Sequence, residues 1–152
     1  MVKFLKEAAQ VKPSKKQLDW FEMESYAFIH FGPNTFTDRE WGQGNEPESI
    51  FNPTKLNCDQ WVEAIKAAGM KGMVLTAKHH DGFCLFDSKY TEFKSTNTKC
   101  GRDLVAEYVE AVRAEGLKVG LYFSCIFVSI MAYSSLDIRP SSSILFAMLI
   151  VI

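Results

Sequence analysis

The sequence predicts an α/β fold in which three apolar strands alternate with amphipathic helices. Short β-prone runs at 26–31, 73–77 and 117–124 are separated by helical patterns at 57–69 and 103–116. Strands joined through helices in this way pair in parallel, and the helices pack outside the sheet. The segments that follow the strands are long and those that follow the helices are short. This asymmetry is typical of barrels and doubly wound folds, whose site lies at the carboxyl ends of the strands.

The chain is expected to begin with a short helix and a strand. Ser14, followed three residues later by Gln17, has the spacing of a capping box and predicts a helix that extends to about Glu24. The apolar run 26–31 is closed by Gly-Pro-Asn at 32–34 and predicts a buried strand.

Two further helix–strand units follow. Asn57 and Gln60 form a second capping-box pair, and Gly69 supplies a stop signal before the strand at 73–77. Asp103 is placed to cap the next helix, which ends at Gly116 before the strand at 117–124. The apolar residues of both helices recur at helical spacing, at Trp61, Val62, Ile65 and Ala68 and at Leu104, Val105, Tyr108, Val109 and Val112.

The composition changes once along the chain. Residues 125–152 are apolar and rich in serine, and Asp137 and Arg139 are their only charged residues. The last apolar run, 144–152, is shorter than the ~20 residues that a membrane span needs. One interpretation is a short membrane-associating tail; the one we favour is sequence foreign to the fold, from a frameshift or an unspliced intron. The chain is thus divided into an N-terminal segment and helix at 1–25, three strands and two helices at 26–124, and a tail at 125–152.

Charge and cysteine spacing exclude several classes of function. The 17 basic and 18 acidic residues leave a net charge of −1, whereas domains that bind nucleic acid are usually strongly basic. The four cysteines include no CxxC pair, so we expect no structural zinc. No dinucleotide, phosphate-loop or HExxH motif is present, and we expect no cofactor. The N-terminus lacks the apolar core of a secretion signal.

All three histidines of the chain lie at the ends of predicted strands. His30 is near the end of the first strand, and His79 and His80 directly follow the second. Because the carboxyl ends of parallel strands meet at one edge of a sheet, we expect a functional site there.

Two site chemistries remain open from the residues alone. A metal centre would use the imidazoles with Asp81, but adjacent His79 and His80 would point in opposite directions in a strand unless the chain bends there. The other chemistry is recognition of a polyhydroxylated ligand, because a neutral imidazole offers one donor and one acceptor. The side chains that would complete such a site are the aromatic rings of Phe36, Trp41 and Phe83 and the carboxylate of Glu40.

The ordered motifs resemble the opening of the α-L-fucosidases of glycoside hydrolase family 29. The resemblance covers roughly residues 14–124, and its motifs are AFIHFG at 27–32, Glu40-Trp41, AKHHDGF at 77–83, Gly101-Arg102-Asp103 and GLYFS at 120–124. It implies the N-terminal part of a (β/α)8 TIM-type barrel, truncated here after about three strands. The implied reaction is retaining hydrolysis of α-L-fucosyl linkages in glycans without a metal.

The resemblance also implies roles for individual residues. The residues that match the fucose pocket of the family are His30, Glu40, Trp41, His79 and His80. Retaining hydrolysis needs two carboxyl groups, a nucleophile and a general acid/base. In the family the nucleophile is an aspartate after the fourth barrel strand, and neither carboxylate has a counterpart here. We therefore expect this chain to be inactive.

Three alternatives are kept beside that expectation: a fucose-binding module without catalysis, a metal-dependent barrel hydrolase, and an unfolded fragment. Three strands of an eight-stranded barrel leave an exposed edge, which favours aggregation. The family acts mostly in lysosomal, periplasmic or extracellular settings, but the sequence leaves the localisation open.

Overall fold

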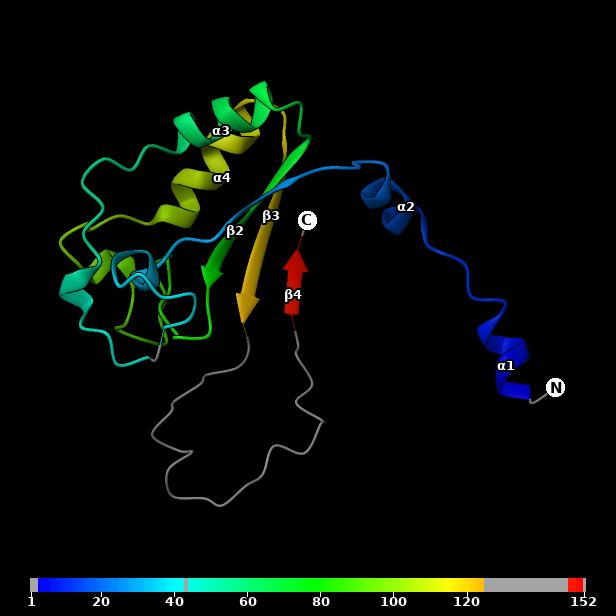
Figure 1. Cartoon of the computed structure of the whole chain (residues 1–152), viewed down its shortest axis with the longest axis horizontal. Coiled ribbons are helices and arrows are strands. Elements are labelled where there is room, and N and C mark those ends of the chain that lie inside the picture. Colours follow the sequence, from blue (N-terminus) through cyan, green and yellow to red (C-terminus); the bar gives the residue numbers. More distant parts are fainter. Residues whose placement is uncertain (1–2, 43, 125–147, 152) are drawn as a thin grey trace, which may run out of the picture.

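The computed structural model describes residues 3–42, 44–124 and 148–151 (Figure 1). In chain order its elements are the helices α1 (Lys3–Ala8) and α2 (Lys15–Phe21), strand β1 (Ala27–Ile29), the short 3-10 helices η1 (Pro33–Phe36) and η2 (Glu48–Ile50), helix α3 (Cys58–Ala67), strand β2 (Gly72–Lys78), the short 3-10 helix η3 (Ser95–Asn97), helix α4 (Leu104–Ala114), and strands β3 (Lys118–Ser124) and β4 (Met148–Val151).

The first three strands form a parallel sheet in the order in which they occur in the chain. Ala27 of β1 faces Met73 of β2, and Gly72 of β2 faces Lys118 of β3. Figure 1 shows α3 and α4 together on one face of this sheet. The predicted α/β class with parallel crossovers is confirmed.

The strand β4 adds an antiparallel neighbour to β3. Its residues come from the apolar tail, and the register pairs Leu121 with Val151 and Ser124 with Met148. Figure 1 shows β4, in red, beside β3. One edge of the three-stranded sheet, that of β3, is therefore paired over four residues.

The helix caps form largely as the sequence predicts. The hydroxyl of Ser14 accepts a hydrogen bond from the Gln17 N–H, and Gln17 returns one by accepting from the Ser14 N–H, although α2 ends at Phe21 rather than near Glu24. Asn57 accepts from the N–H groups of Asp59 and Gln60 at the start of α3. Each of these caps satisfies N–H groups that a helix cannot bond internally.

The first strand is less buried than we predicted. β1 is an edge strand, and the side chain of Phe28 is 44% exposed. In contrast, the central strand β2 is buried from Gly72 to Ala77, because it has a strand on each side and helices on one face.

A single phenol joins the helix layer to the sheet. Tyr108 of α4 is fully buried, and its hydroxyl donates toward the carbonyl oxygens of Met73 in β2 (2.6 Å) and Gly120 in β3 (3.1 Å). Gly120 permits close packing here, because a Cβ at this position would lie 2.7 Å from Cγ2 of Val74. The strands at the centre of the sheet are thus fixed against α4 by packing and by a buried polar contact.

No helix among the described residues is both long enough and apolar enough to span a bilayer.

We predict that Tyr108→Phe destabilises the fold by about 1–2 kcal/mol, because it removes the buried hydrogen bonds while keeping the ring. Urea unfolding followed by circular dichroism measures the change. Tyr90→Phe is the matched control, since Tyr90 is 99% exposed and its loss of a hydroxyl should leave stability unchanged. Equal midpoints for the two variants would contradict the prediction.

Candidate functional site

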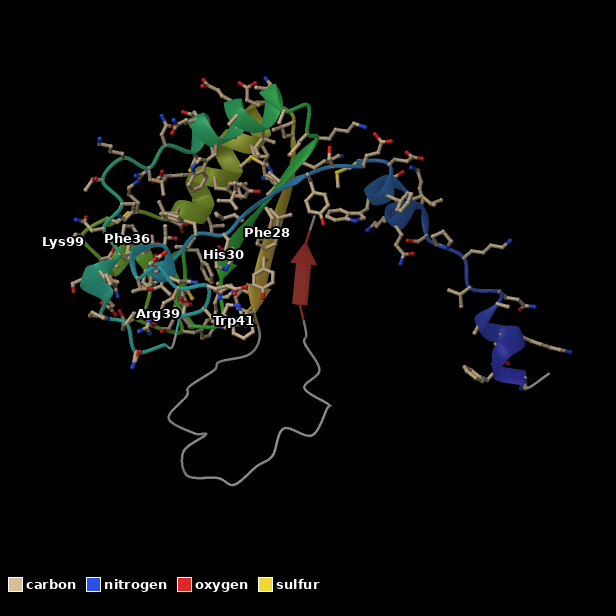
Figure 2. The ribbon with its side chains drawn as sticks, in the orientation of Figure 1. Phe28, His30, Phe36, Arg39, Trp41 and Lys99 are labelled. Atoms are coloured by element: carbon tan, nitrogen blue, oxygen red, sulfur yellow. The ribbon has the colours of Figure 1, made fainter. Side chains whose placement is uncertain are left out.

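The three histidines meet at the carboxyl ends of β1 and β2. His30 directly follows β1, and its ring centroid lies 4.4 Å from that of His79. The rings of His79 and His80 are also 4.4 Å apart. Figure 2 shows His30 on the side of its loop that faces β2 and β3. The sequence placed these residues at one edge of the sheet, and the structure gathers their rings into one cluster.

A bend after β2 allows the neighbouring residues His79 and His80 to face the same site. Thr76 faces Tyr122 and Lys78 faces Phe123, so the pairing of β2 with β3 shifts by one residue between Thr76 and Lys78. The chain then turns, and the Gly82 N–H donates to the His79 carbonyl at 3.1 Å. The strand alternation that would separate the two imidazoles therefore ends before them.

The Glu40-Trp41 pair reaches the site from the loop after β1. The Trp41 ring lies 5.3 Å from the His80 ring in an edge-on arrangement and remains 56% exposed. The Glu40 carbonyl accepts a hydrogen bond from the buried Asn34 side chain at 2.9 Å, which ties this loop to η1. Trp41 consequently presents an aromatic surface beside the histidines (Figure 2).

The two loops of the site touch through a glycine. A Cβ at Gly42 would lie 2.7 Å from Cβ of Asp81, so the loop after β1 packs directly on the turn after β2. Trp41 precedes Gly42 and His80 precedes Asp81, so this contact sets the distance between the indole and the imidazole.

Two side chains of β3 complete the cluster, and neither was predicted from the sequence to belong to the site. Tyr122 stacks on His79 with 5.8 Å between ring centroids and also contacts Phe28. Ser124 Oγ lies 2.7 Å from His80 Nδ1. The signal that could have found them is the period of two in a strand, which places Tyr122 and Ser124 on one face at the carboxyl end of β3.

Two of the aromatic residues that we expected to line the site, Phe83 and Phe36, lie away from it. Phe83 is 2% exposed and packs against Phe51 and Phe93 in the core, so the expectation that it covers a ligand is wrong. The reason is that the turn after His80 directs Phe83 inward. Phe36 contacts Phe31 and Phe51, and Figure 2 shows it apart from His30 and Trp41.

Comparison with known proteins identifies the family. The family model described as Alpha-L-fucosidase matches residues 7–140. The chain belongs to the α-L-fucosidases of glycoside hydrolase family 29. The match continues beyond Ser124 to residue 140, into the segment that we predicted to be a tail.

Several relatives show how much of the length of a family member this chain covers. It is 51% identical over 115 residues to Alpha-L-fucosidase 1 of Arabidopsis thaliana, covering 74% of this chain and 23% of that protein. It is 38% identical over 152 residues to the human plasma alpha-L-fucosidase, covering 77% and 32%. The crystal structure of a putative alpha-L-fucosidase from Bacteroides ovatus superposes with a TM-score of 0.76 at 42% identity, covering 80% and 22%. The chain thus spans about a fifth to a third of the relatives' length and contains part of the family's barrel domain.

The surroundings of His79 and His80 in this chain keep both imidazoles neutral at pH 7. Burial, together with the neighbouring His30 and His80, lowers the pKa of His79 to about 4. The pKa of His80 is lowered by burial and then by the ammonium of Lys78 and by His30. At neutral pH, both rings therefore offer one donor and one acceptor.

The pKa of the neighbouring Asp81 carboxyl group is raised, whereas those of the histidines are lowered. Asp81 is 1% exposed, and its burial raises the pKa to about 6 despite the hydrogen bond that Oδ1 accepts from the Phe83 N–H at 2.9 Å. The nearby Glu46 also raises this pKa. Within the described part of the chain, Asp81 Oδ2 and His79 Nδ1 are buried without a hydrogen-bond partner.

The metal-centre alternative has no donor set in the described residues. Within residues 3–42, 44–124 and 148–151, no group of three or more His, Cys, Asp or Glu side chains is arranged to hold a metal ion.

We predict that His79 stays neutral down to about pH 4, whereas an unperturbed histidine titrates near 6.5. Because the folded pKa is below the unfolded one, the contribution of His79 to stability is complete above pH 6.5 and is lost as the pH falls toward 4. NMR titration of the imidazole protons measures this pKa. His30→Gln should raise it, though not to 6.5, because burial is the larger cause. A wild-type value near 6.5 would contradict the prediction.

We also predict that Gly42→Ala separates Trp41 from His80, because the new Cβ would overlap the Asp81 side chain. Acrylamide quenching of tryptophan fluorescence should increase. Gly69→Ala is the matched control: Gly69 has φ +74° and no neighbour within 4 Å of its would-be Cβ. That control therefore strains the backbone without touching the site. Unchanged quenching in Gly42→Ala would show that the contact does not position the indole.

Proposed function

We propose that residues 26–124 form the fucose-recognition part of an α-L-fucosidase, with His30, Glu40, Trp41, His79 and His80 contacting the sugar. The observation that carries this proposal is the cluster of imidazoles beside the exposed Trp41 ring. The natural ligand would be a terminal α-L-fucosyl group of a glycan or glycoconjugate.

The chemistry of the cluster suits this sugar. Fucose has several hydroxyl groups and a methyl group, so its recognition needs paired donors and acceptors together with an apolar surface. Neutral His79 and His80 supply the former. Trp41 supplies a flat apolar face, and Glu40 precedes it as a charged acceptor.

The same residues are unsuited to retaining hydrolysis by themselves. That reaction needs two carboxyl groups about 5–5.5 Å apart on the two sides of the glycosidic bond. Among the described carboxylates around the site, Asp81 and Glu46 are both buried, at 1% and 8% exposure. Glu40 is exposed, and its charge acts on the imidazole of His30. We therefore propose that this chain binds fucose without hydrolysing it.

Binding is tested by isothermal titration with L-fucose, with D-fucose as the matched control ligand because it has the same groups in mirror-image arrangement. We expect Trp41→Ala to weaken L-fucose binding by a factor of about 3–10, the value of one aromatic contact. Tyr90→Ala removes an aromatic ring that is 99% exposed and should leave the affinity unchanged. Equal binding of the two enantiomers would contradict the proposal.

Hydrolysis is tested separately with an aryl α-L-fucoside. We expect no release of the aryl group above the uncatalysed rate. Turnover near that of a full-length family member would show that the chain has a complete catalytic apparatus.

A further inference from the structure

A buried carboxyl group lies where the two loops of the site meet. Asp81 is 1% exposed, and its Oδ1 accepts a hydrogen bond from the Phe83 N–H at 2.9 Å. No group in the described part of the chain donates to Oδ2. Gly42 packs on this oxygen, because a Cβ at Gly42 would lie 3.0 Å from Oδ2 and 2.7 Å from Cβ of Asp81. The loop that carries Trp41 therefore rests directly on the Asp81 carboxyl group.

The charged groups near Asp81 do not neutralise a negative charge on it. Glu46, on the loop after β1, is 8% exposed, and its Oε2 accepts a hydrogen bond from the Gly44 N–H at 2.9 Å. Its charge repels an ionised Asp81. The ammonium of Lys78 attracts Asp81 but donates to the Ser124 carbonyl at 2.9 Å. None of the ion pairs among the described residues includes Asp81.

The other titratable side chains on the turn after β2 carry no charge near pH 7. Burial lowers the pKa of the two imidazoles and raises the pKa of the thiol, and these groups belong to His79, His80 and Cys84. A negative charge on Asp81 would therefore be buried, beside a second carboxylate and without an ion-pair partner in the described chain.

Ionisation of Asp81 consequently acts against the packing of the two loops. Burial raises the pKa of Asp81 from 3.8 to about 6, against the hydrogen bond from Phe83 and with a smaller contribution from Glu46. A loosened loop that exposes the carboxyl group to water returns the pKa to its ordinary value. The packed form is then most favoured below about pH 4 and loses stability as the pH rises to about 6. The ratio of loosened to packed chains rises about tenfold between pH 5 and pH 7.

We propose that Asp81 is a positioning residue whose neutral carboxyl group lets the loop after β1 pack on the turn after β2, and whose ionisation loosens that contact. Trp41 precedes Gly42 and His80 precedes Asp81, so loosening moves the indole away from the imidazole, from which it now lies 5.3 Å. The inference rests on the proposed function for its ligand only, because the position of Trp41 can be measured without sugar.

The position of Trp41 is measured by acrylamide quenching of tryptophan fluorescence in the full chain between pH 4.5 and pH 8. The chain has three tryptophans, and Trp41→Phe identifies the part of the signal that belongs to Trp41. We expect quenching of Trp41 to increase with a midpoint near pH 6. Asp81→Asn keeps an oxygen for the Phe83 N–H and cannot ionise, so its quenching should not change over this range.

Two further variants make the result specific to Asp81. Asp59→Asn is the matched control, because Asp59 is exposed in the first turn of α3, and this variant should keep the wild-type profile. Glu46→Gln keeps an oxygen for the Gly44 N–H and removes the repelling charge, so it should lower the midpoint and serves if Asp81→Asn does not fold. A flat wild-type profile, or a transition that Asp81→Asn retains, overturns the proposal. If only Glu46→Gln folds, an unchanged midpoint overturns it.

The affinity for L-fucose gives a second readout. At pH 5 the wild type and Asp81→Asn should bind equally, whereas at pH 7.5 Asp81→Asn should bind about threefold to tenfold more tightly, because more of it is packed. The two proposals fail in different ways. A Trp41 transition that Asp81→Asn abolishes, with no fucose binding by any variant, supports the role of Asp81 and overturns the proposed function. Fucose binding with a flat wild-type profile overturns the role of Asp81 and leaves the proposed function standing.

Discussion

The site depends on where β2 stops pairing regularly with β3. β2 is hydrogen-bonded on both sides and buried along most of its length, so it has little freedom to adjust. The shift between Thr76 and Lys78 is therefore the point at which the chain can turn. Had regular alternation continued, His79 and His80 would project to opposite faces of the sheet, and no imidazole pair could form. Because the shift occurs against a rigid neighbour, it fixes the direction of both rings.

The same constraint explains the electrostatics of the cluster. Turning the histidines toward one another removes them from water and places three imidazoles together, and both effects disfavour protonation. Lys78 adds a positive charge at the base of the turn. A charged cluster would bind anions, whereas a neutral one offers alternating donors and acceptors. Burial thus keeps neutral the histidines that would be partly charged in slightly acidic solution, so that each ring has one donor and one acceptor nitrogen.

Local signals in the sequence were sufficient to predict the helices α2 to α4 and the strands β1 to β3. They were insufficient to predict the side-chain contacts between segments that are distant in the chain. Ser14, Asn57 and Asp103 were correctly predicted as caps, because capping depends on residues within three positions of each other. The histidines were correctly expected to meet, because parallel strands align their ends. The burial of Phe83, the contact between Gly42 and Asp81 and the hydrogen bond between Ser124 and His80 join segments whose relative placement depends on the turn after β2. The pairing of β4 with β3 likewise depends on tertiary placement, because an apolar run does not encode its partner.

The arrangement also explains how recognition and bond cleavage could be separated along the chain of a fucosidase. Among the described residues, the ring, hydrogen-bond and packing contacts of the cluster come from β1, β2, β3 and the loops that directly follow β1 and β2. Gly42 fits the first loop to the second, and Ser124 joins the second loop to β3. The end of β3 that contributes to this surface is also paired with β4, where Ser124 faces Met148. Hydrolysis makes a different demand, since it requires carboxyl groups placed on two sides of a sugar, and a barrel can supply these from strands across the sheet. On the function proposed above, the cluster at β1 to β3 would hold the sugar, and carboxyl groups on other strands of a family barrel would cleave its linkage.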